Sequence, residues 1–287
     1  MTIVRISATT WLVAGSLLIA APPAAPQTSQ KAAPQAEAQA AQPAPKKPVV
    51  LPKADVIMDR YVQATGGRAA YEKRKTEISI GTMEVTGRNI KGTATTYATA
   101  GGNTYSAVEI AGVGKIESGV TDGVVWEQSA LQGARIKQGD EKADSLRDMT
   151  FNAPIHWRQI YEKVETVALE TMEGQACYKL TATPPSGRTE TLYFSKDTGL
   201  LVRRDKVMTS PMGEVAVQYV AAEYTDFNGV KVPSRMVQRA AGQEFVVTID
   251  SVKINEEIPA ERFEMPADVK ALLAKDEKEA PQEKDGK

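Results

Sequence analysis

The side chains that most often carry catalysis are scarce in this chain, which contains one histidine, His156, and one cysteine, Cys177. A Ser-His-Asp triad would have to use His156, yet no serine lies in the Gly-x-Ser-x-Gly motif that presents a nucleophile. One histidine and one cysteine cannot complete a tetrahedral zinc site either. We therefore expect His156, between Ile155 and Trp157, to be a structural residue of an apolar helix, and Cys177 to be a residue of a strand.

The acidic residues and the glycines show no spacing that predicts a metal or phosphate site. No segment matches the Asp-x-Asp-x-Asp-Gly calcium loop, and Gly112-Val113-Gly114 lacks the lysine and hydroxyl residue of a phosphate-binding loop. Two carboxylates need only meet in space to hydrolyse a glycosidic bond, so a carboxylate-dependent hydrolase remains a minor alternative. The sequence otherwise predicts a protein that is not an enzyme, with no catalytic residue, no cofactor and no metal.

The charge pattern does not favour a nucleic-acid partner. The 287 residues include 35 basic and 36 acidic ones, a formal net charge of −1, so no global field would attract polyanions. The nearest candidate for a basic patch is the segment 203–206, Arg-Arg-Asp-Lys. Strand alternation would send Arg203 and Arg204 to opposite faces, and we expect a solvated strand edge there.

Large apolar side chains concentrate in residues 140–161, where the pattern predicts two short helices interrupted at Asn152-Ala153-Pro154. Such helices would close one mouth of a curled sheet, and a curled sheet of about eight or more strands leaves room for a small apolar ligand. The alternative is that these side chains simply complete the core. The residues predicted to bind a ligand, in the cavity or its lid, are Trp126, Leu146, Met149, Phe151, Trp157, Ile160 and Tyr161, with Tyr178 and Leu180 behind them.

The elements that would position these residues are mainly strands. Apolar residues at helical spacing in 56–64, followed by Gly66-Gly67, predict an N-terminal helix, and a short turn through 69–71 follows. From residue 76 the apolar period changes to two. The predicted strands cover residues 76–86, 90–99, 103–110, 114–120, 123–129, 163–171, 176–183, 189–195, 200–208, 214–225, 231–239 and 244–255, and a final turn lies near 269–273.

Apolar residues occupy both faces of some predicted strands. In 76–86, Ile78 and Ile80 share one face while Met83 and Val85 share the other, so both sides would bury something. A curled sheet with helices packed against it accounts for this pattern better than a flat sheet with one wet face. The predicted fold is mainly β (α+β): a curled antiparallel sheet that forms an unclosed β-barrel, with an N-terminal helix and short lid helices.

The N-terminus predicts export. Arg5 precedes an apolar run over residues 11–21, and small residues follow, which is the pattern of a signal peptide over residues 1–25. The run is shorter than the roughly 18 apolar residues of a membrane span, which favours cleavage over the alternative of an uncleaved anchor. No cysteine comes directly after the run, where a lipoprotein would need one, so the exported chain is not expected to be a lipoprotein.

Composition divides the rest of the chain into three parts. Residues 26–53 are rich in alanine and proline and predict a disordered linker. Residues 54–273 are predicted to form one domain, which is an ordinary domain size. The mixed charges of residues 274–287 predict a disordered tail.

Two hairpin motifs and one helix end carry a resemblance to a known family. The hairpins are YFSKDTGLLVRR (193–204) and DFNGVKVPSRM (226–236), and the helix ends in Ala64-Thr65-Gly66-Gly67. With the run of strands and the helical interruption between them, the domain resembles the LolA/LolB-like superfamily of bacterial outer-membrane lipoprotein-sorting proteins. The resemblance covers most of residues 54–270 and implies an unclosed β-barrel, lidded by helices, in the periplasm.

The same resemblance implies a non-enzymatic carrier whose apolar interior receives a hydrophobic guest, such as a lipid or the acyl chains of a lipoprotein. Relatives with this fold also act as sensors that bind a protein. A scaffold or sensor that binds a periplasmic or outer-membrane protein through a sheet edge is therefore the main alternative. The long linker and charged tail depart from a minimal carrier, and we expect a divergent member of the superfamily.

Overall fold

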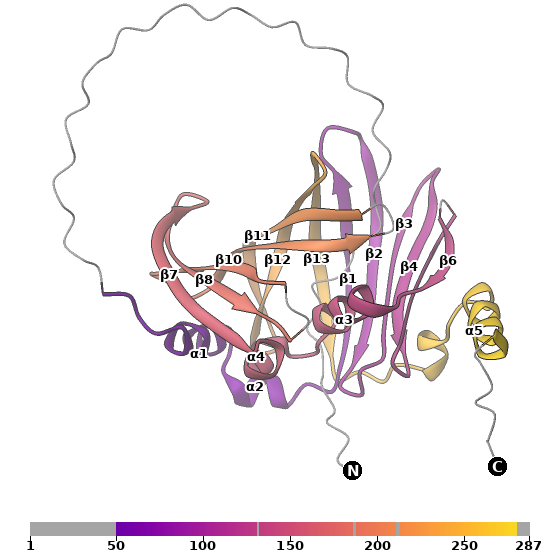
Figure 1. The fold of residues 1–287 in the computed structure, drawn as a ribbon, viewed down its shortest axis with the longest axis horizontal. Coiled ribbons are helices and arrows are strands. Elements are labelled where there is room, and N and C mark those ends of the chain that lie inside the picture. The colour runs from indigo at the N-terminus through magenta and orange to yellow at the C-terminus, as the bar shows by residue number, and fades with distance from the viewer. Residues whose placement is uncertain (1–49, 131, 186–187, 211–212, 280–287) are drawn as a thin grey trace, which may run out of the picture.

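One curled antiparallel sheet dominates the computed structural model, which describes residues 50–130, 132–185, 188–210 and 213–279 (Figure 1). The predicted signal peptide, nearly all of the predicted linker and the end of the predicted tail lie outside these residues. The strands are β1 (Thr76–Val85), β2 (Ile90–Thr99), β3 (Thr104–Ile110), β4 (Gly114–Thr121), β5 (Val124–Ser129), β6 (Gly133–Ile136), β7 (Lys163–Met172), β8 (Gln175–Thr183), β9 (Glu190–Ser195), β10 (Leu201–Ser210), β11 (Gly213–Phe227), β12 (Val230–Ala240) and β13 (Gln243–Ile254).

The strand order explains why the sheet stays open. It runs β6-β5-β4-β3-β2-β1-β13-β12-β11-β10-β9-β8-β7, so two meanders are joined by the pairing of β1 with β13. The edges, β6 and β7, follow each other in the chain, and the segment between them contains α3 (Gly139–Asp148), η1 (Ala153–His156) and α4 (Trp157–Ile160). Helices therefore connect the two edge strands, and β6 does not pair with β7 to close a barrel. The predicted fold class is confirmed.

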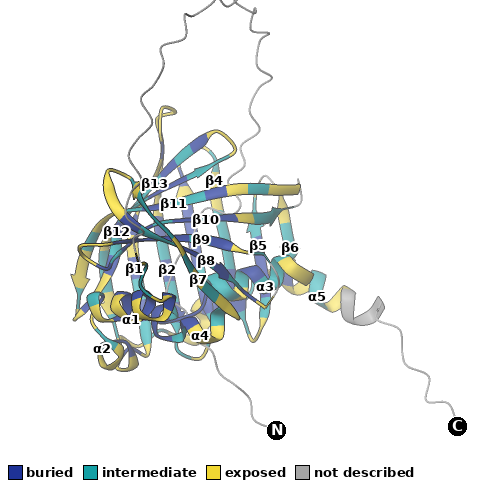
Figure 2. Cartoon of the chain, turned by 60° about the vertical axis from the view of Figure 1, so that its left-hand side comes forward, coloured by how far each residue is buried: buried dark blue, intermediate teal, exposed yellow. Residues whose placement is uncertain are grey.

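The N-terminal helices cover the concave face of the second meander, which is the face that also carries α4. In α1 (Ala54–Ala64), Ile57, Met58, Tyr61 and Val62 are buried, whereas Val56, part of the predicted apolar stripe, is exposed. The helix accordingly carries both buried and exposed colours in Figure 2. The short α2 (Arg68–Glu72) buries Tyr71. These residues form one core cluster with side chains of β8, β9, β10 and β12, so the helices are fixed by apolar packing.

A β-bulge in β10 decides which of its charged residues faces the concave side. Leu201 pairs with Phe194 and Arg203 with Tyr193, so the register shifts between them. Arg203 consequently lies over the Tyr193 ring, and Arg204 points to the opposite, concave face. The predicted opposite placement of the two arginines is confirmed. The predicted solvated edge is wrong, because β10 lies inside the sheet and Arg204 is only 7% exposed.

Two elements differ from the sequence-based expectation. The four-residue strand β6 was not expected, since its sequence, Gly-Ala-Arg-Ile, is short and contains one large apolar residue. At the C-terminal end, η2 (Ala260–Phe263) leads into α5 (Ala267–Glu279), which is longer than the predicted turn. In both views α5 lies outside the sheet beside β6 (Figures 1 and 2). It thus packs at the β5–β6 edge of the first meander.

Candidate binding cavity

A cavity of about 70 Å³ lies between α1, the η1–α4 segment and the concave face of β9 and β10. One wall is apolar, and the other carries charged and hydroxyl groups. The volume is less than half of the ~150 Å³ that holds a benzene molecule, so the cavity has room for a small apolar group. The lining residues are Met58, Tyr61, Arg147, Asp148, Ala153, Pro154, Trp157, Ile160, Tyr161, Leu192, Phe194, Leu201 and Arg204.

Contacts between α1 and α4 hold the apolar wall together. The Tyr61 and Phe194 rings lie 5.3 Å apart at an interplanar angle of 55°. Trp157 Nε1 donates to Asp59 Oδ1 at 3.1 Å, and Arg158 donates to both Asp59 oxygens at 2.9 Å. The hydrogen bonds from Arg158 hold the pKa of Asp59 below its ordinary value. The wall therefore behaves as one packed unit of helix and sheet.

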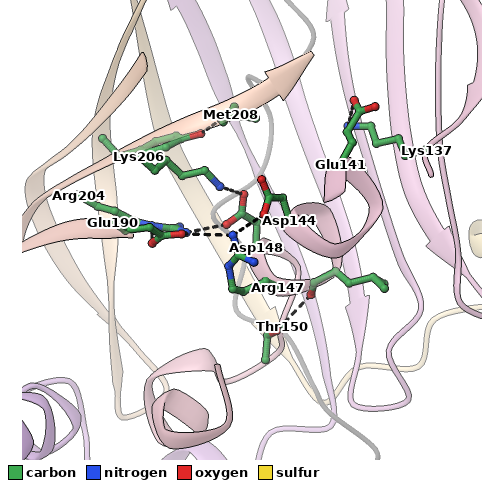
Figure 3. Close-up of polar contacts among 12 residues, drawn as sticks. Lys137, Glu141, Asp144, Arg147, Asp148, Thr150, Glu190, Arg204, Lys206 and Met208 are labelled. Atoms are coloured by element: carbon green, nitrogen blue, oxygen red, sulfur yellow. Dashed lines mark hydrogen bonds and ion pairs between the residues drawn. The ribbon is translucent and has the colours of Figure 1, made fainter. Parts of the chain in front are cut away.

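The polar wall is an ion-pair network between α3 and the sheet (Figure 3). Arg204 forms a bidentate pair with Glu190 of β9, with Nε–Oε2 and Nη2–Oε1 distances of 2.8 and 2.9 Å. Its Nη2 also donates to Asp148 Oδ1 of α3 at 2.8 Å, and Lys206 Nζ donates to Asp148 Oδ2 at 2.5 Å. The two oxygens of Asp148 are therefore held by two different cations of β10.

Further contacts extend this network around Glu190. Tyr161, just after α4, donates its hydroxyl to Glu190 Oε2 at 3.0 Å. Arg147 of α3 donates to Asp144 Oδ1 at 2.6 Å and lies 3.5 Å from Glu190 Oε1. Glu190 is thus contacted by side chains from β10, from α3 and from the segment after α4. Glu190, Arg204, Lys206 and Asp144 are buried, whereas Tyr161, Arg147 and Asp148 are partly exposed.

Burial and charge oppose each other in the network. Burial raises the pKa of Asp148, but the charges of Lys206 and Arg204 lower it more, and the net pKa lies well below the ordinary value. Burial likewise raises the pKa of Glu190, but the charge of Arg204 lowers it more, so the net pKa is below the ordinary value. Burial lowers the pKa of Arg204, but the charges of Glu190 and Asp148 raise it by more, so the net pKa lies above the ordinary value. Asp148 and Glu190 are therefore ionised at neutral pH, as is Arg204.

A second set of ion pairs connects α3 to the opposite edge of the sheet. Glu141 of α3 pairs with Arg135 and lies 3.8 Å from Lys137 Nζ, both on or just after β6 (Figure 3). Glu127 of β5 pairs with Arg135, and also with Lys137 at 3.0 Å. Since Asp148 contacts β10 on the other side, α3 bridges the two walls of the opening through charged contacts.

The predicted ligand-binding residues separate into groups. Trp157, Ile160 and Tyr161 line the cavity, and Tyr178 and Leu180 belong to the core cluster behind it. Met149 and Phe151 pack on the concave face of the first meander with Ala98, Val120 and Val125. Leu146 is 38% exposed on α3. The helical segment thus spreads its apolar residues over two separate clusters.

Trp126 lies on the other side of the sheet from the cavity. Its neighbour Val125 packs with Met149 and Phe151 on the concave face, so alternation sends Trp126 to the convex face. There its Nε1 donates to Thr121 Oγ1 at 3.1 Å, and that hydroxyl donates to the Phe263 carbonyl at 2.6 Å. The structure therefore places Trp126 beneath the C-terminal segment, away from α3 and α4.

The sequence reasoning missed the charged residues of the cavity. A signal for them exists: Asp144, Arg147 and Asp148 are spaced i, i+3 and i+4 on one face of a helix. Arg204 and Lys206 are two residues apart and share one face of a strand. Neither pattern shows by itself that these two faces meet.

The described residues form neither a metal cluster nor a membrane-spanning helix. No group of three or more histidine, cysteine or carboxylate residues in this part of the chain is arranged to hold a metal ion. His156 is half-buried, and burial lowers its pKa below the ordinary value. No described helix is both long enough and apolar enough to cross a membrane.

Similarity to known proteins is detectable in the fold. No protein-family model matches the sequence, and no curated protein matches it. A solved DUF1329 family protein from Desulfovibrio piger is 17% identical with a TM-score of 0.51, covering 73% of this chain and 96% of that one. A LolA superfamily protein from Nitrosomonas europaea is 11% identical with a TM-score of 0.50, covering 75% and 99%. The chain is thus a divergent protein with the LolA-like fold.

Proposed function

We propose that this protein is an exported, periplasmic and non-enzymatic carrier or binder of a hydrophobic ligand, either a lipid or the acyl chains of a lipoprotein. One observation carries the proposal: a cavity with one apolar wall lies in the opening of an unclosed barrel, and a helical segment beside it forms ion pairs with both sides of the sheet. Apolar lining supplies affinity of about 25 cal/mol per Å² of buried apolar surface. The predicted signal peptide would direct the chain to the periplasm.

The composition of α3 suits a movable lid. Leu146 is its one large apolar residue and is 38% exposed, whereas its buried side is made of Asp144 and the partly buried Arg147 and Asp148. Moving this helix into water exposes little apolar surface. The charges regain hydration as their pairs separate, which offsets much of the lost Coulomb energy. The helix can therefore leave the opening without disrupting the apolar core that holds α1.

Lid movement is required by the size of the cavity. About 70 Å³ does not accommodate an acyl chain. With α3 displaced, the cavity becomes continuous with the concave face of the first meander, where Met149 and Phe151 now pack. Trp157, Ile160 and Tyr161 would then form the entrance, with Leu180 and Tyr178 supporting the wall behind. The binding roles of these predicted residues remain part of the proposal.

The proposal is tested by purifying the mature protein from the periplasm and recording native mass spectra. We expect a population carrying a lipid-sized added mass. The variant Ala153→Phe, which fills the cavity, should lose that population, whereas Val207→Phe, an exposed residue of β10 directed to the convex face, should keep it. Absence of any added mass, together with no thermal shift by acylated ligands, would contradict the carrier function.

A second candidate is a scaffold or sensor that binds a protein partner at β7. This ten-residue strand is a sheet edge with one pairing neighbour, β8, and Val167 is 47% exposed at its bulge. Such an edge offers backbone groups for β-augmentation, although the bulge and the charges of Lys163 and Glu165 are features that protect edges. Repeated capture of one periplasmic protein by cross-linking from β7, with no bound lipid, would favour this function over the carrier.

The geometry gives less support to a hydrolase. Asp148 lines the cavity and Glu190 pairs with the lining residue Arg204. Both carboxylates have lowered pKa values because of the cations beside them. A glycosidase needs one carboxyl group whose pKa is raised so that it can act as a general acid. Assays with glycoside substrates should therefore give no turnover.

A further inference from the structure

We propose that the ligand is an anionic amphiphile, and that its acidic head group replaces the Asp148 carboxylate on Lys206 and Arg204 when α3 leaves the opening. This inference rests on the proposed carrier function and names the ligand class. Asp148 would then be an internal substitute for the ligand's head group, and the closed form would be a self-occupied site.

The charges of the network are divided unequally between the sheet and the lid. The sheet contributes Arg204, Lys206 and Glu190, a net charge of +1, whereas α3 contributes Asp144, Arg147 and Asp148, a net charge of −1. The network is neutral only while α3 is in place. Displacement of the helix therefore leaves the concave wall of β9 and β10 with one excess positive charge.

Lys206 is the cation that depends most on the lid. Its side chain is 1% exposed, and Asp148 is the one carboxylate within ion-pair distance of its ammonium group among the residues that the structure describes. Arg204, by contrast, keeps its bidentate pair with Glu190 on the neighbouring strand. When α3 leaves, water reaches this ammonium group, but its carboxylate partner is gone. An open lid thus leaves Lys206 as an unpaired cation that an anionic head group can bind.

The position of Asp148 defines the shape of that anion. One of its oxygens accepts from Arg204 Nη2 at 2.8 Å and the other accepts from Lys206 Nζ at 2.5 Å. A head group with two oxygens on one central atom, such as a carboxylate or a phosphate, reproduces this two-point contact. A neutral hydroxyl does not supply the charge.

The same location places an attached hydrocarbon chain on apolar residues. Arg204 lines the cavity and pairs in register with Leu192, and Leu201 pairs with Phe194. Leu192, Phe194 and Leu201 all line the cavity. A head group bound at Arg204 and Lys206 would therefore lay its tail along these three side chains, beneath the wall formed by α1 and α4. The cations thus lie where the head group of an amphiphile would bind, and the apolar side chains lie where its hydrocarbon tail would follow.

The test compares three ligands with the same chain: hexadecanoic acid, hexadecyl phosphate and hexadecanol. Each displaces a neutral fluorescent probe from the mature protein. We expect at least one acid to bind about tenfold or more tightly than the alcohol, as a charge-assisted contact would produce. The stronger of the two acids identifies the head group as a carboxylate or a phosphate. Equal binding of acids and alcohol overturns this inference and leaves the carrier function standing.

Single substitutions test whether Lys206 and Asp148 cause the preference for acids over the alcohol. Lys206→Met should remove the preference for the acids without weakening the alcohol, whereas Lys179→Met, which removes a partly exposed lysine of β8, should keep it. Asp148→Asn removes the internal carboxylate and should strengthen acid binding about tenfold, a measurement that remains informative if Lys206→Met does not fold. An unchanged acid preference in Lys206→Met, or weaker acid binding in Asp148→Asn, overturns the inference. If none of the three ligands binds, the carrier function fails and this inference fails with it.

Discussion

Gly66, at the end of α1, lies directly against Gly229 in the turn between β11 and β12, and a Cβ atom added to Gly66 would be 2.2 Å from the Gly229 carbonyl oxygen. The Lys231 amide donates to the Thr65 carbonyl at 3.0 Å beside this contact. The helix end and the Asn-Gly turn, two of the motifs behind the family resemblance, therefore meet in space. This contact positions α1, and with it the apolar wall of the cavity.

Gly66→Ala should destabilise the protein by about 2 kcal/mol or more, because it combines a steric clash with a φ of +126° that side chains rarely adopt. Urea unfolding measures the change in free energy. The control Gly87→Ala has a φ of +76° and no atom within 4 Å of the added Cβ, so its loss should be limited to roughly 1 kcal/mol. Equal losses in the two variants would show that the contact with Gly229 is unimportant.

Much of this fold follows from local sequence. The period-two runs and glycine turns predicted all strands except β6, because pleating and turn chemistry depend on neighbours in the chain. The face of a strand is harder to predict. Alternation separates Trp126 from Val125, but whether Trp126 faces the cavity or the convex side depends on where α5 and the helical segment pack. These are long-range contacts.

The charged wall of the cavity was likewise not predicted, because it also depends on long-range contacts. Arg204 reaches the concave face because of the bulge between Leu201 and Arg203, and its burial depends on Glu190 of the neighbouring strand and Asp148 of α3. No residue near Arg204 in sequence indicates these partners. A buried ion pair needs two distant elements to meet, so composition and spacing predicted a solvated arginine.

Asp148→Asn should cost about 3 kcal/mol or more of folding free energy. The substitution leaves Lys206 buried without its counter-ion and removes one contact of Arg204. Glu165→Gln is the matched control, since it removes one carboxylate from an exposed pair with Lys163, and such pairs contribute about 1 kcal/mol or less. Both values come from chemical denaturation at neutral pH. A cost for Asp148→Asn no larger than the control would mean that the network is solvated in solution.

Stability should fall on acidification, because Asp148 and Glu190 have pKa values below their ordinary values of 3.8 and 4.5. A carboxylate with a lowered folded-state pKa contributes its full stabilisation above the unfolded-state pKa and loses it as the pH falls toward the folded-state value. The loss should therefore begin at about pH 5 and grow below pH 4. Melting temperatures across this range should fall less steeply in Asp148→Asn than in the wild type. Identical slopes would exclude Asp148 as a source of the acid sensitivity.

Ligand binding should be reported by one tryptophan and not by the other. Trp157 lines the cavity, whereas Trp126 is fully buried on the convex face beneath the C-terminal segment. The third tryptophan, Trp11, belongs to the predicted signal peptide and would be absent from the mature chain. In Trp126→Phe a bound acyl ligand should still shift the emission of Trp157, since entry of the chain changes its surroundings. In Trp157→Phe the remaining emission should stay constant when ligand is added, provided that displacement of a probe shows binding. A ligand-dependent shift from Trp126 alone would move the binding site to the convex face and contradict the cavity between α1, α4 and β9–β10.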